Sequence, residues 1–189
     1  MLKYNNKSYH IPLRLLEVLQ EFTELGWDFN ISGSLSLLCQ GLLDRPVKDL
    51  DLVVTSFEPM EAWRKNNNKS WVKYSESVCE IPGEVPEDIY MGFTYRGLKI
   101  DLFLKEELED SKEVQVSDGI YKCSNADYII AAKIEFINKF YTKGIASGLC
   151  KDRLKTLRKH TQDLEEIFRR RGDLMAASNK VPADKLPFQ

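Results

Sequence analysis

Two aspartates one residue apart have the type and the spacing to bind a metal ion. Asp49 and Asp51 lie in the segment VKDLDLVV, which has the alternation of a β-strand. Alternate side chains of a strand point to the same face, so the carboxylates share one face while Leu50 and Leu52 share the other. Carboxylates this close repel each other unless a cation lies between them. Mg²⁺ is usually held by one or two carboxylates together with substrate phosphates, so the pair favours metal-dependent phosphoryl chemistry.

A third acid and a Gly-Ser pair extend this candidate site. Asp101 lies in the middle of LKIDLFL, where its apolar neighbours give little reason for a charge. Gly33 and Ser34 follow a short apolar segment and precede a helix-like one. Gly33 would let the backbone approach a triphosphate closely, because it has no Cβ. Ser34 and the next amides would open a helix whose N-terminus faces the phosphates.

Each of these residues also has a structural interpretation. An Asp-x-Asp pair is often only solvated or part of a helix cap. Asp101 could pair with Arg96 or Lys99 instead of binding a metal ion. Ser34 could be a helix N-cap, a role that uses the same geometry as phosphate binding. The combination of the aspartate pair, the Gly-Ser turn and the third acid is what favours catalysis over these alternatives.

Hydrophobic spacing predicts the elements that would position these residues. Up to residue 67 we expect helices over 11–25, 34–43 and 57–67 and strands over 27–31 and 47–54. After it we expect strands over 70–75, 89–95 and 98–104, a hairpin over 112–123, and helices over 124–141 and 152–171. The turn at Arg96 and Gly97 should join the strands over 89–95 and 98–104 into a hairpin, with Asp101 in its second strand. The fold class is therefore α/β (α+β), a mixed sheet flanked by helices with a C-terminal helical pair. We place the catalytic α/β domain at 1–123, the helical region at 124–177 and a flexible tail at 178–189.

The composition argues against several classes of function. The chain of 189 residues has 27 basic and 29 acidic side chains, so no overall positive charge demands a nucleic-acid partner. Four cysteines are scattered without a C-x-x-C pair, which is typical of reduced thiols and not of a zinc site or a disulfide framework. The N-terminus is too polar for a secretory leader and no apolar run could span a membrane, so we expect a cytoplasmic protein.

The order of these motifs resembles the nucleotidyltransferase superfamily of the DNA polymerase β type. In that family a strand leads into a Gly-Ser turn, and a helix then precedes a strand that carries the Asp-x-Asp pair. A third acid lies on a neighbouring strand. The same order is formed here by Gly33, Ser34, Asp49, Asp51 and Asp101. The resemblance implies the fold of that superfamily.

The C-terminal helices look like those of small bacterial proteins related to AbiEii-type toxins. In such relatives a lysine in the first of these helices and an acid near the second complete the site. Lys133 matches the lysine and Asp163 the acid, while His160 stands where relatives often have an acid. The resemblance therefore implies nucleotide binding by Gly33, Ser34 and Lys133.

A helical wheel places Lys133 beside residues that we expect to face the core. At 100° per residue it lies close to Ile130, Ile134 and Ile137, so its charge needs a route to solvent or an anionic partner. A triphosphate would be such a partner, and Lys133→Ala should then lower turnover strongly while affecting stability little. The simpler interpretation is a lysine on a solvated face. The basic cluster within 151–159 has two interpretations as well, a solvated face or an electropositive wall against a triphosphate or an RNA end.

The resemblance implies an enzyme that moves a nucleoside monophosphate from an NTP to an acceptor hydroxyl with Mg²⁺ or Mn²⁺. Asp49 and Asp51 would bind both of two metal ions and Asp101 only the one that activates the hydroxyl, so these three are the expected catalytic and metal-binding residues. Candidate acceptors are an RNA such as a tRNA 3′ end, a protein side chain and a small molecule such as an aminoglycoside. A cognate antitoxin is a candidate partner. The alternatives are a catalytically silent regulator of the same fold that binds a nucleotide or a partner, and a Mg²⁺-dependent phosphohydrolase, which the lack of an accompanying histidine disfavours.

Overall fold

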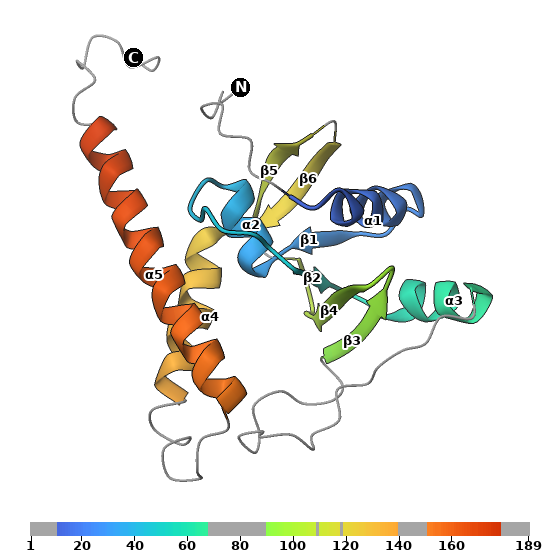
Figure 1. The fold of residues 1–189 in the computed structure, drawn as a ribbon. Coiled ribbons are helices and arrows are strands. Elements are labelled where there is room, and N and C mark those ends of the chain that lie inside the picture. The colour runs from blue at the N-terminus through green and yellow to red at the C-terminus, as the bar shows by residue number, and fades with distance from the viewer. Residues whose placement is uncertain (1–10, 68–89, 109, 118, 140–150, 179–189) are drawn as a thin grey trace.

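The computed structural model describes residues 11–67, 90–108, 110–117, 119–139 and 151–178 (Figure 1). Its helices are α1 (Leu13–Glu24), α2 (Gly33–Cys39), α3 (Glu58–Asn67), α4 (Ala126–Lys139) and α5 (Lys151–Ser178). Its strands are β1 (Phe29–Ile31), β2 (Asp49–Val54), β3 (Tyr90–Tyr95), β4 (Leu98–Leu104), β5 (Ser111–Val116) and β6 (Gly119–Ser124). None of the described helices is long and apolar enough to cross a bilayer.

The strands form one mixed sheet in the order β3-β4-β2-β1-β6-β5. Its centre is the antiparallel pair β1–β2, and each of these two strands has a parallel neighbour, β6 beside β1 and β4 beside β2. Antiparallel hairpins, β3–β4 and β5–β6, form the two ends. The mixed sheet flanked by helices confirms the fold class predicted from the sequence, including the hairpin that carries Asp101.

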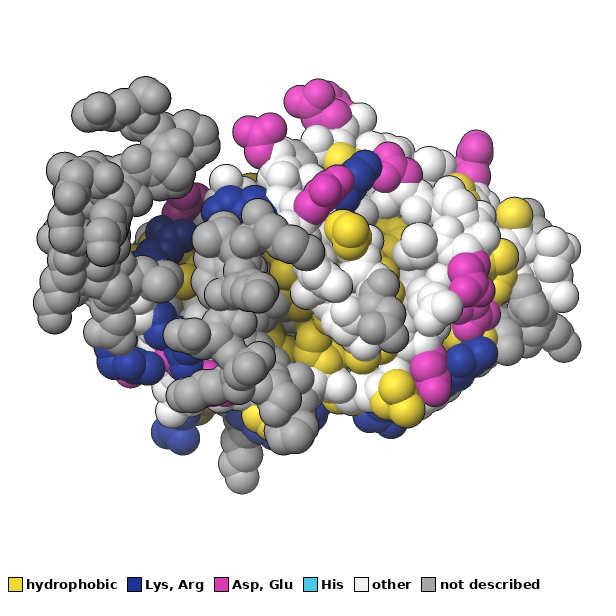
Figure 2. All heavy atoms as spheres, turned by 90° about the horizontal axis from the view of Figure 1, so that it is seen from above, with side chains coloured by type: hydrophobic (Ala, Val, Ile, Leu, Met, Phe, Trp, Pro, Cys, Tyr) yellow, Lys and Arg dark blue, Asp and Glu magenta, His cyan; other side chains and the backbone are white. Residues whose placement is uncertain are grey.

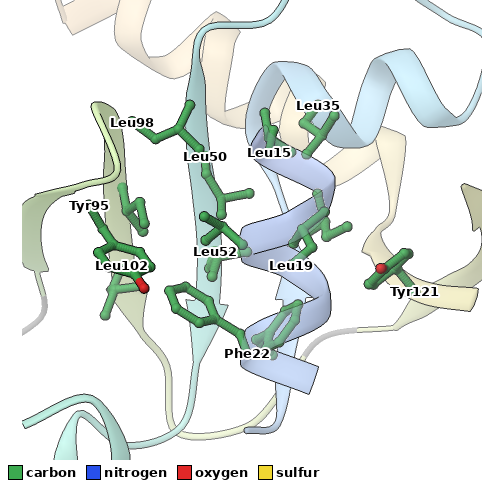
Figure 3. Packing of buried hydrophobic residues seen from close by; sticks show 14 of the residues in the cluster. Leu15, Leu19, Phe22, Leu35, Leu50, Leu52, Tyr95, Leu98, Leu102 and Tyr121 are labelled. Carbon is green, nitrogen blue, oxygen red and sulfur yellow. The ribbon is translucent and has the colours of Figure 1, made fainter. Parts of the chain in front are cut away.

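One face of the sheet is covered by α1, whose apolar residues recur at helical spacing. Leu15, Leu19 and Phe22 have no exposed surface, and Figure 3 shows them beside Leu50 and Leu52 of β2. Because the side chains of a strand alternate, burial of these two leucines under α1 turns the aspartates of β2 to the opposite face. The core under α1 therefore determines which face of the sheet carries the acids.

On the other side of the sheet, α4 and α5 lie side by side (Figure 1). They share a second core with α2, made of buried residues from all three helices, such as Leu37, Ile129 and Ile167. The sequence prediction that Ile134 faces this core is wrong, because its side chain is exposed. The helix pair therefore packs on α2, directly behind the Gly-Ser turn.

The helix after the Gly-Ser turn is shorter than its apolar pattern predicts. It ends at Cys39 and not at residue 43, because Gly41 takes a left-handed conformation with φ +74°. The amide of Leu42 then donates to the carbonyl of Leu37 and that of Gly41 to Leu38, the pattern of a Schellman C-cap. The chain then returns to β2 through a loop that contains Arg45.

Several sequence predictions fall outside the described residues. They concern the strand expected over 70–75, the joint between the two C-terminal helices, and the tail from 179 onward. The proposed domain boundaries also stay predictions. The face shown in Figure 2 exposes acidic, basic and hydrophobic side chains.

Candidate active site

The three aspartates predicted as metal ligands lie on one face of the sheet. Asp51 of β2 is the direct neighbour of Asp101 on β4, and Asp49 lies two residues before it on the same strand. In a pair of parallel strands, residues in register point to the same side of the sheet, so the side chains of Asp51 and Asp101 lie next to each other. Asp101 is nearly buried, with 5% of its surface exposed. We call this group the acidic face.

The two outer carboxylates of the acidic face each have a cation beside them. Lys99 Nζ donates to Asp101 Oδ2 at 2.7 Å, and the Tyr90 hydroxyl donates to Asp101 Oδ1. Lys159 Nζ of α5 lies 3.8 Å from Asp49 Oδ2. The structural partner of Asp101 suggested by the sequence is therefore present in Lys99.

The middle carboxylate, that of Asp51, accepts no hydrogen bond from any residue that the structure describes. Its side chain is half-buried, and Asp101 and Asp49 add their negative charges. Burial first and these two neighbours second raise the pKa of Asp51 from 3.8 to about 7. A carboxylate in this position is stabilised when a cation replaces its proton.

Gly33 determines how closely the turn approaches this carboxylate. Its φ is +56°, and a Cβ built on it would lie 1.8 Å from Asp51 Oδ2. No other residue type could stand there without displacing the Asp51 side chain. The glycine predicted from the sequence to admit a phosphate therefore already makes room for the Asp51 carboxylate.

Ser34 is not a helix N-cap, because the N-cap position of α2 is Ser32. Its hydroxyl instead accepts a hydrogen bond from Arg45 Nη2 at 2.7 Å. Arg45 also binds Asp163 of α5 with two bonds, Nε to Oδ1 at 2.6 Å and Nη2 to Oδ2 at 2.8 Å. The Gly-Ser turn is thus tied to the C-terminal helix by a single arginine.

Lys133 is buried and does not lie on a solvated face. Its exposed fraction is 5%, and its ammonium donates to Asp163 Oδ2 at 2.9 Å and lies 3.0 Å from His160 Nδ1. The anionic partner that the helical wheel demanded is therefore Asp163 in this structure. The contact of Lys133 with a phosphate stays a prediction.

The charges of this buried network follow from its contacts. Burial raises the pKa of Asp163, but the hydrogen bonds and charges of Arg45 and Lys133 outweigh burial and leave it below the ordinary value. Burial lowers the pKa of Lys133, and Asp163 opposes that shift. Burial, together with the charge of Lys133, lowers the pKa of His160 to about 4. At neutral pH His160 is therefore uncharged, and we assign its Nδ1 as the acceptor of the lysine proton.

The basic residues of α5 next to this network are on its surface. A hollow of about 680 Å³ is lined by Leu154, Lys155, Arg158, Lys159 and Gln162. Lys159 belongs both to this hollow and to the surroundings of Asp49. Lys159 thus places one positive charge beside the acidic face, while Lys151 and Arg153 fall outside the described side chains.

Sequence reasoning missed Arg45 and Tyr90. Nothing near Arg45 in the sequence points to Asp163, which lies 118 residues away. Tyr90 could have been found, because the β3–β4 register pairs Gly92 with Asp101 and puts Tyr90 two residues along on the same face. A Cβ on Gly92 would lie 2.7 Å from the Tyr90 hydroxyl, so this glycine leaves room for the tyrosine.

No protein-family model matches the chain, and no curated protein matches it. Among solved structures, a candidate nucleotidyltransferase from Thermotoga maritima aligns with a TM-score of 0.50 at 17% identity, over 84% of this chain and 99% of its own. ANT(2")-Ia, solved with adenylyl-2"-tobramycin, aligns with a TM-score of 0.50 at 12% identity, over 88% of this chain and 97% of its own. The chain therefore shares its overall fold with these two proteins.

Proposed function

We propose that this protein is a metal-dependent nucleotidyltransferase that moves a nucleoside monophosphate from an NTP to an acceptor hydroxyl. The observation that carries the proposal is the Asp51 carboxylate, which lies beside Asp101, in contact with the backbone of Gly33, without a hydrogen-bond donor among the described residues. A cation is the partner that such a group lacks. The likeness in fold to nucleotidyltransferases supports the same chemistry.

The residues fit Mg²⁺ or Mn²⁺ held jointly with substrate. Among the described residues no three His, Cys, Asp or Glu side chains could enclose a metal ion by themselves. Mg²⁺ does not require such a cage, because it is usually held by one or two carboxylates and the phosphates of the substrate. Asp51 would hold the ion with help from Asp49 and Asp101. The ion would supply stabilisation of the charge that develops on the phosphoryl oxygens and on leaving pyrophosphate.

The remaining residues of the site would bind and orient the substrates. Gly33 and Ser34 would receive the triphosphate, and the buried ammonium of Lys133 would add positive charge behind it. Tyr90 and Lys99 hold the Asp101 carboxylate in place next to the position proposed for the acceptor hydroxyl. Catalysis of this type depends on positioning and electrostatics, so no nucleophilic side chain is required.

The acceptor belongs to one of three classes: an RNA, a protein or a small molecule. The solved complex of ANT(2")-Ia contains an adenylylated small molecule, which shows that a protein with this fold can carry such a product. The similarity of the C-terminal helices to AbiEii-type toxins favours RNA or protein modification, with an antitoxin as a possible partner. These finer assignments are part of the proposal.

The experiment that tests the proposal incubates the purified protein with Mg²⁺ and a cell lysate. Each of the four NTPs is supplied in turn with a radiolabel on its α-phosphate. We expect label in one of the RNA, protein or small-molecule fractions, and no label with the Asp51→Asn variant. The matched control is Asp44→Asn, because Asp44 lies in the nearby loop, pairs with Arg170 and is not part of the acidic face.

One observation favours a second candidate, a catalytically silent regulator that binds a nucleotide or a partner. Lys99 and Lys159 already place positive charge at both ends of the acidic face. NTP binding without transfer to any fraction would support this candidate over the enzyme.

A further inference from the structure

Arg45 holds two parts of the molecule that are far apart in the sequence. It comes from the loop between α2 and β2 and uses one edge of its guanidinium to bind both carboxylate oxygens of Asp163. The same Nη2 that binds Asp163 also donates to Ser34 Oγ in the Gly-Ser turn. A planar fork with several donors is required for this arrangement, and arginine alone among the side chains provides it.

The Asp163 end of this bridge is fixed. The side chain of Asp163 has 2% of its surface exposed and accepts a second cation, Lys133, at 2.9 Å. Lys133 belongs to α4 and Asp163 to α5, so this ion pair links the two helices. Moving Arg45 would leave a buried charge only partly compensated, which is costly. The helix pair therefore determines where the guanidinium lies.

The Ser34 end of the bridge has a chemical consequence. A hydroxyl has one proton to donate and lone pairs to accept. Since Ser34 Oγ accepts from a cation, its own proton must point elsewhere, and no described residue takes it. Two further contacts fix the Gly-Ser turn. The Ser32 amide donates a hydrogen bond to the Asp51 carbonyl oxygen at 2.8 Å, and Gly33 contacts the Asp51 side chain. The hydroxyl therefore keeps a proton to donate, in the same turn whose Gly33 contacts Asp51.

We infer that Arg45 is a positioning residue, through which the α4–α5 pair orients the Ser34 hydroxyl for a phosphate oxygen of the NTP. This inference rests on the proposed function and adds to it the means by which the C-terminal helices influence nucleotide affinity. Arg45 itself need not touch the nucleotide. Its influence passes through Ser34, so the two residues should act as one unit in nucleotide binding.

Arg170 of α5 offers a matched control. It also ties α5 to the loop after α2, through Gly41 O at 3.4 Å and Asp44 Oδ2 at 3.2 Å. These two bonds end on the loop, whereas those of Arg45 reach Ser34 in the turn. Arg45→Lys and Arg170→Lys both keep the charge and remove the fork. A purely structural role for Arg45 predicts that the two substitutions behave alike.

The test has two readouts. Hydrogen exchange of the amides around Ser34, without nucleotide, reports the order of the turn. Calorimetry with the best-bound of the four magnesium NTPs reports affinity, in the wild type and in a Ser34→Ala background. Arg45→Lys should accelerate exchange in the turn and raise the Kd about tenfold, the loss typical of a hydrogen bond to a charged group. Arg170→Lys should change neither readout by more than about twofold, and Arg45→Lys should add less than about twofold once Ser34 is alanine.

The possible failures are distinguishable. Equal effects of the two arginine variants, or a full tenfold effect of Arg45→Lys in the Ser34→Ala background, would overturn the positioning role. Unchanged exchange in Arg45→Lys would overturn it as well. If the wild type binds none of the four NTPs, the proposed function fails and the phosphate role of Ser34 fails with it, whereas faster exchange in Arg45→Lys would still show that Arg45 orders the turn. Arg45→Gln is measured in the same way if the lysine variant does not fold.

Discussion

Asp51→Asn should stabilise the protein in the absence of metal, and the gain should grow with pH. The neutral amide resembles a protonated carboxyl and removes the repulsion from Asp49 and Asp101. The pKa of Asp51 is about 7 in the folded protein against 3.8 ordinarily, so the folded state binds more protons than the unfolded state between these values. The stability contributed by Asp51 therefore falls as the pH rises through this window.

The magnitude follows from the two pKa values. The cost of ionising Asp51 in the fold reaches at most about 4 kcal/mol near pH 8 and about 1.5 kcal/mol near pH 5. Urea unfolding in EDTA, followed by tryptophan fluorescence, measures it, because Trp63 lies in the core and Trp27 packs against it. The matched control is Asp44→Asn, which removes a carboxylate outside the acidic face.

With metal and nucleotide bound, the wild type should become more stable than Asp51→Asn. Ligands that bind only the folded state raise the melting temperature, so Mg²⁺ with an NTP should stabilise the wild type and leave Asp51→Asn nearly unchanged. An Asp51→Asn protein that is no more stable than the wild type near pH 8 would refute the reasoning, because the carboxylate would then not be under electrostatic strain.

Three further outcomes are expected. The pKa of His160 is about 4 in the folded protein and ordinarily 6.5, so the unfolded state binds more protons between these pH values. The free energy of unfolding should therefore fall by up to about 3 kcal/mol as the pH drops from 6.5 to 4. Urea unfolding should show this loss in the wild type and not in His160→Gln. Gly33→Ala should destabilise the protein by about 2 kcal/mol and impair nucleotide binding, because φ is +56° and the new Cβ would overlap Asp51 Oδ2; unchanged urea midpoint and affinity would contradict this. Lys133→Met should lower both turnover and stability, the latter by about 2 kcal/mol, because Asp163 keeps Arg45 but loses one of its two cations; thermal unfolding without any shift would show that the pair contributes nothing.

The residues of the acidic face could be predicted from the sequence because patterns within single strands are enough to identify them. Alternation in DLDLVV puts Asp49 and Asp51 on one face of a strand, and a charged residue among apolar neighbours, such as Asp101, indicates a functional role. The turn at Arg96 and Gly97 was enough to predict the hairpin that carries Asp101. What local pattern could not predict is that β4 lies parallel to β2 with Asp101 opposite Asp51.

The buried network could not be predicted, because it joins distant segments through side-chain geometry. The helical wheel indicated that Lys133 needs an anionic partner. It could not show whether that partner is a triphosphate or, as in the structure, Asp163. The expectation that Lys133 matters little for stability changes with this contact. Likewise, no period in the sequence shows that Arg45 binds Ser34 and Asp163 together.

The most direct test of the central claim compares two labels on the same NTP. The protein, Mg²⁺ and a lysate are incubated with the best-bound NTP, labelled either at the α-phosphate or at the γ-phosphate. Transfer of a nucleoside monophosphate predicts that the α-label becomes attached to an acceptor and the γ-label leaves as pyrophosphate, both in the wild type and neither in Asp51→Asn. Attachment of the γ-label to the acceptor, or release of γ-label as inorganic phosphate with the α-label still in a free nucleotide, would contradict the account.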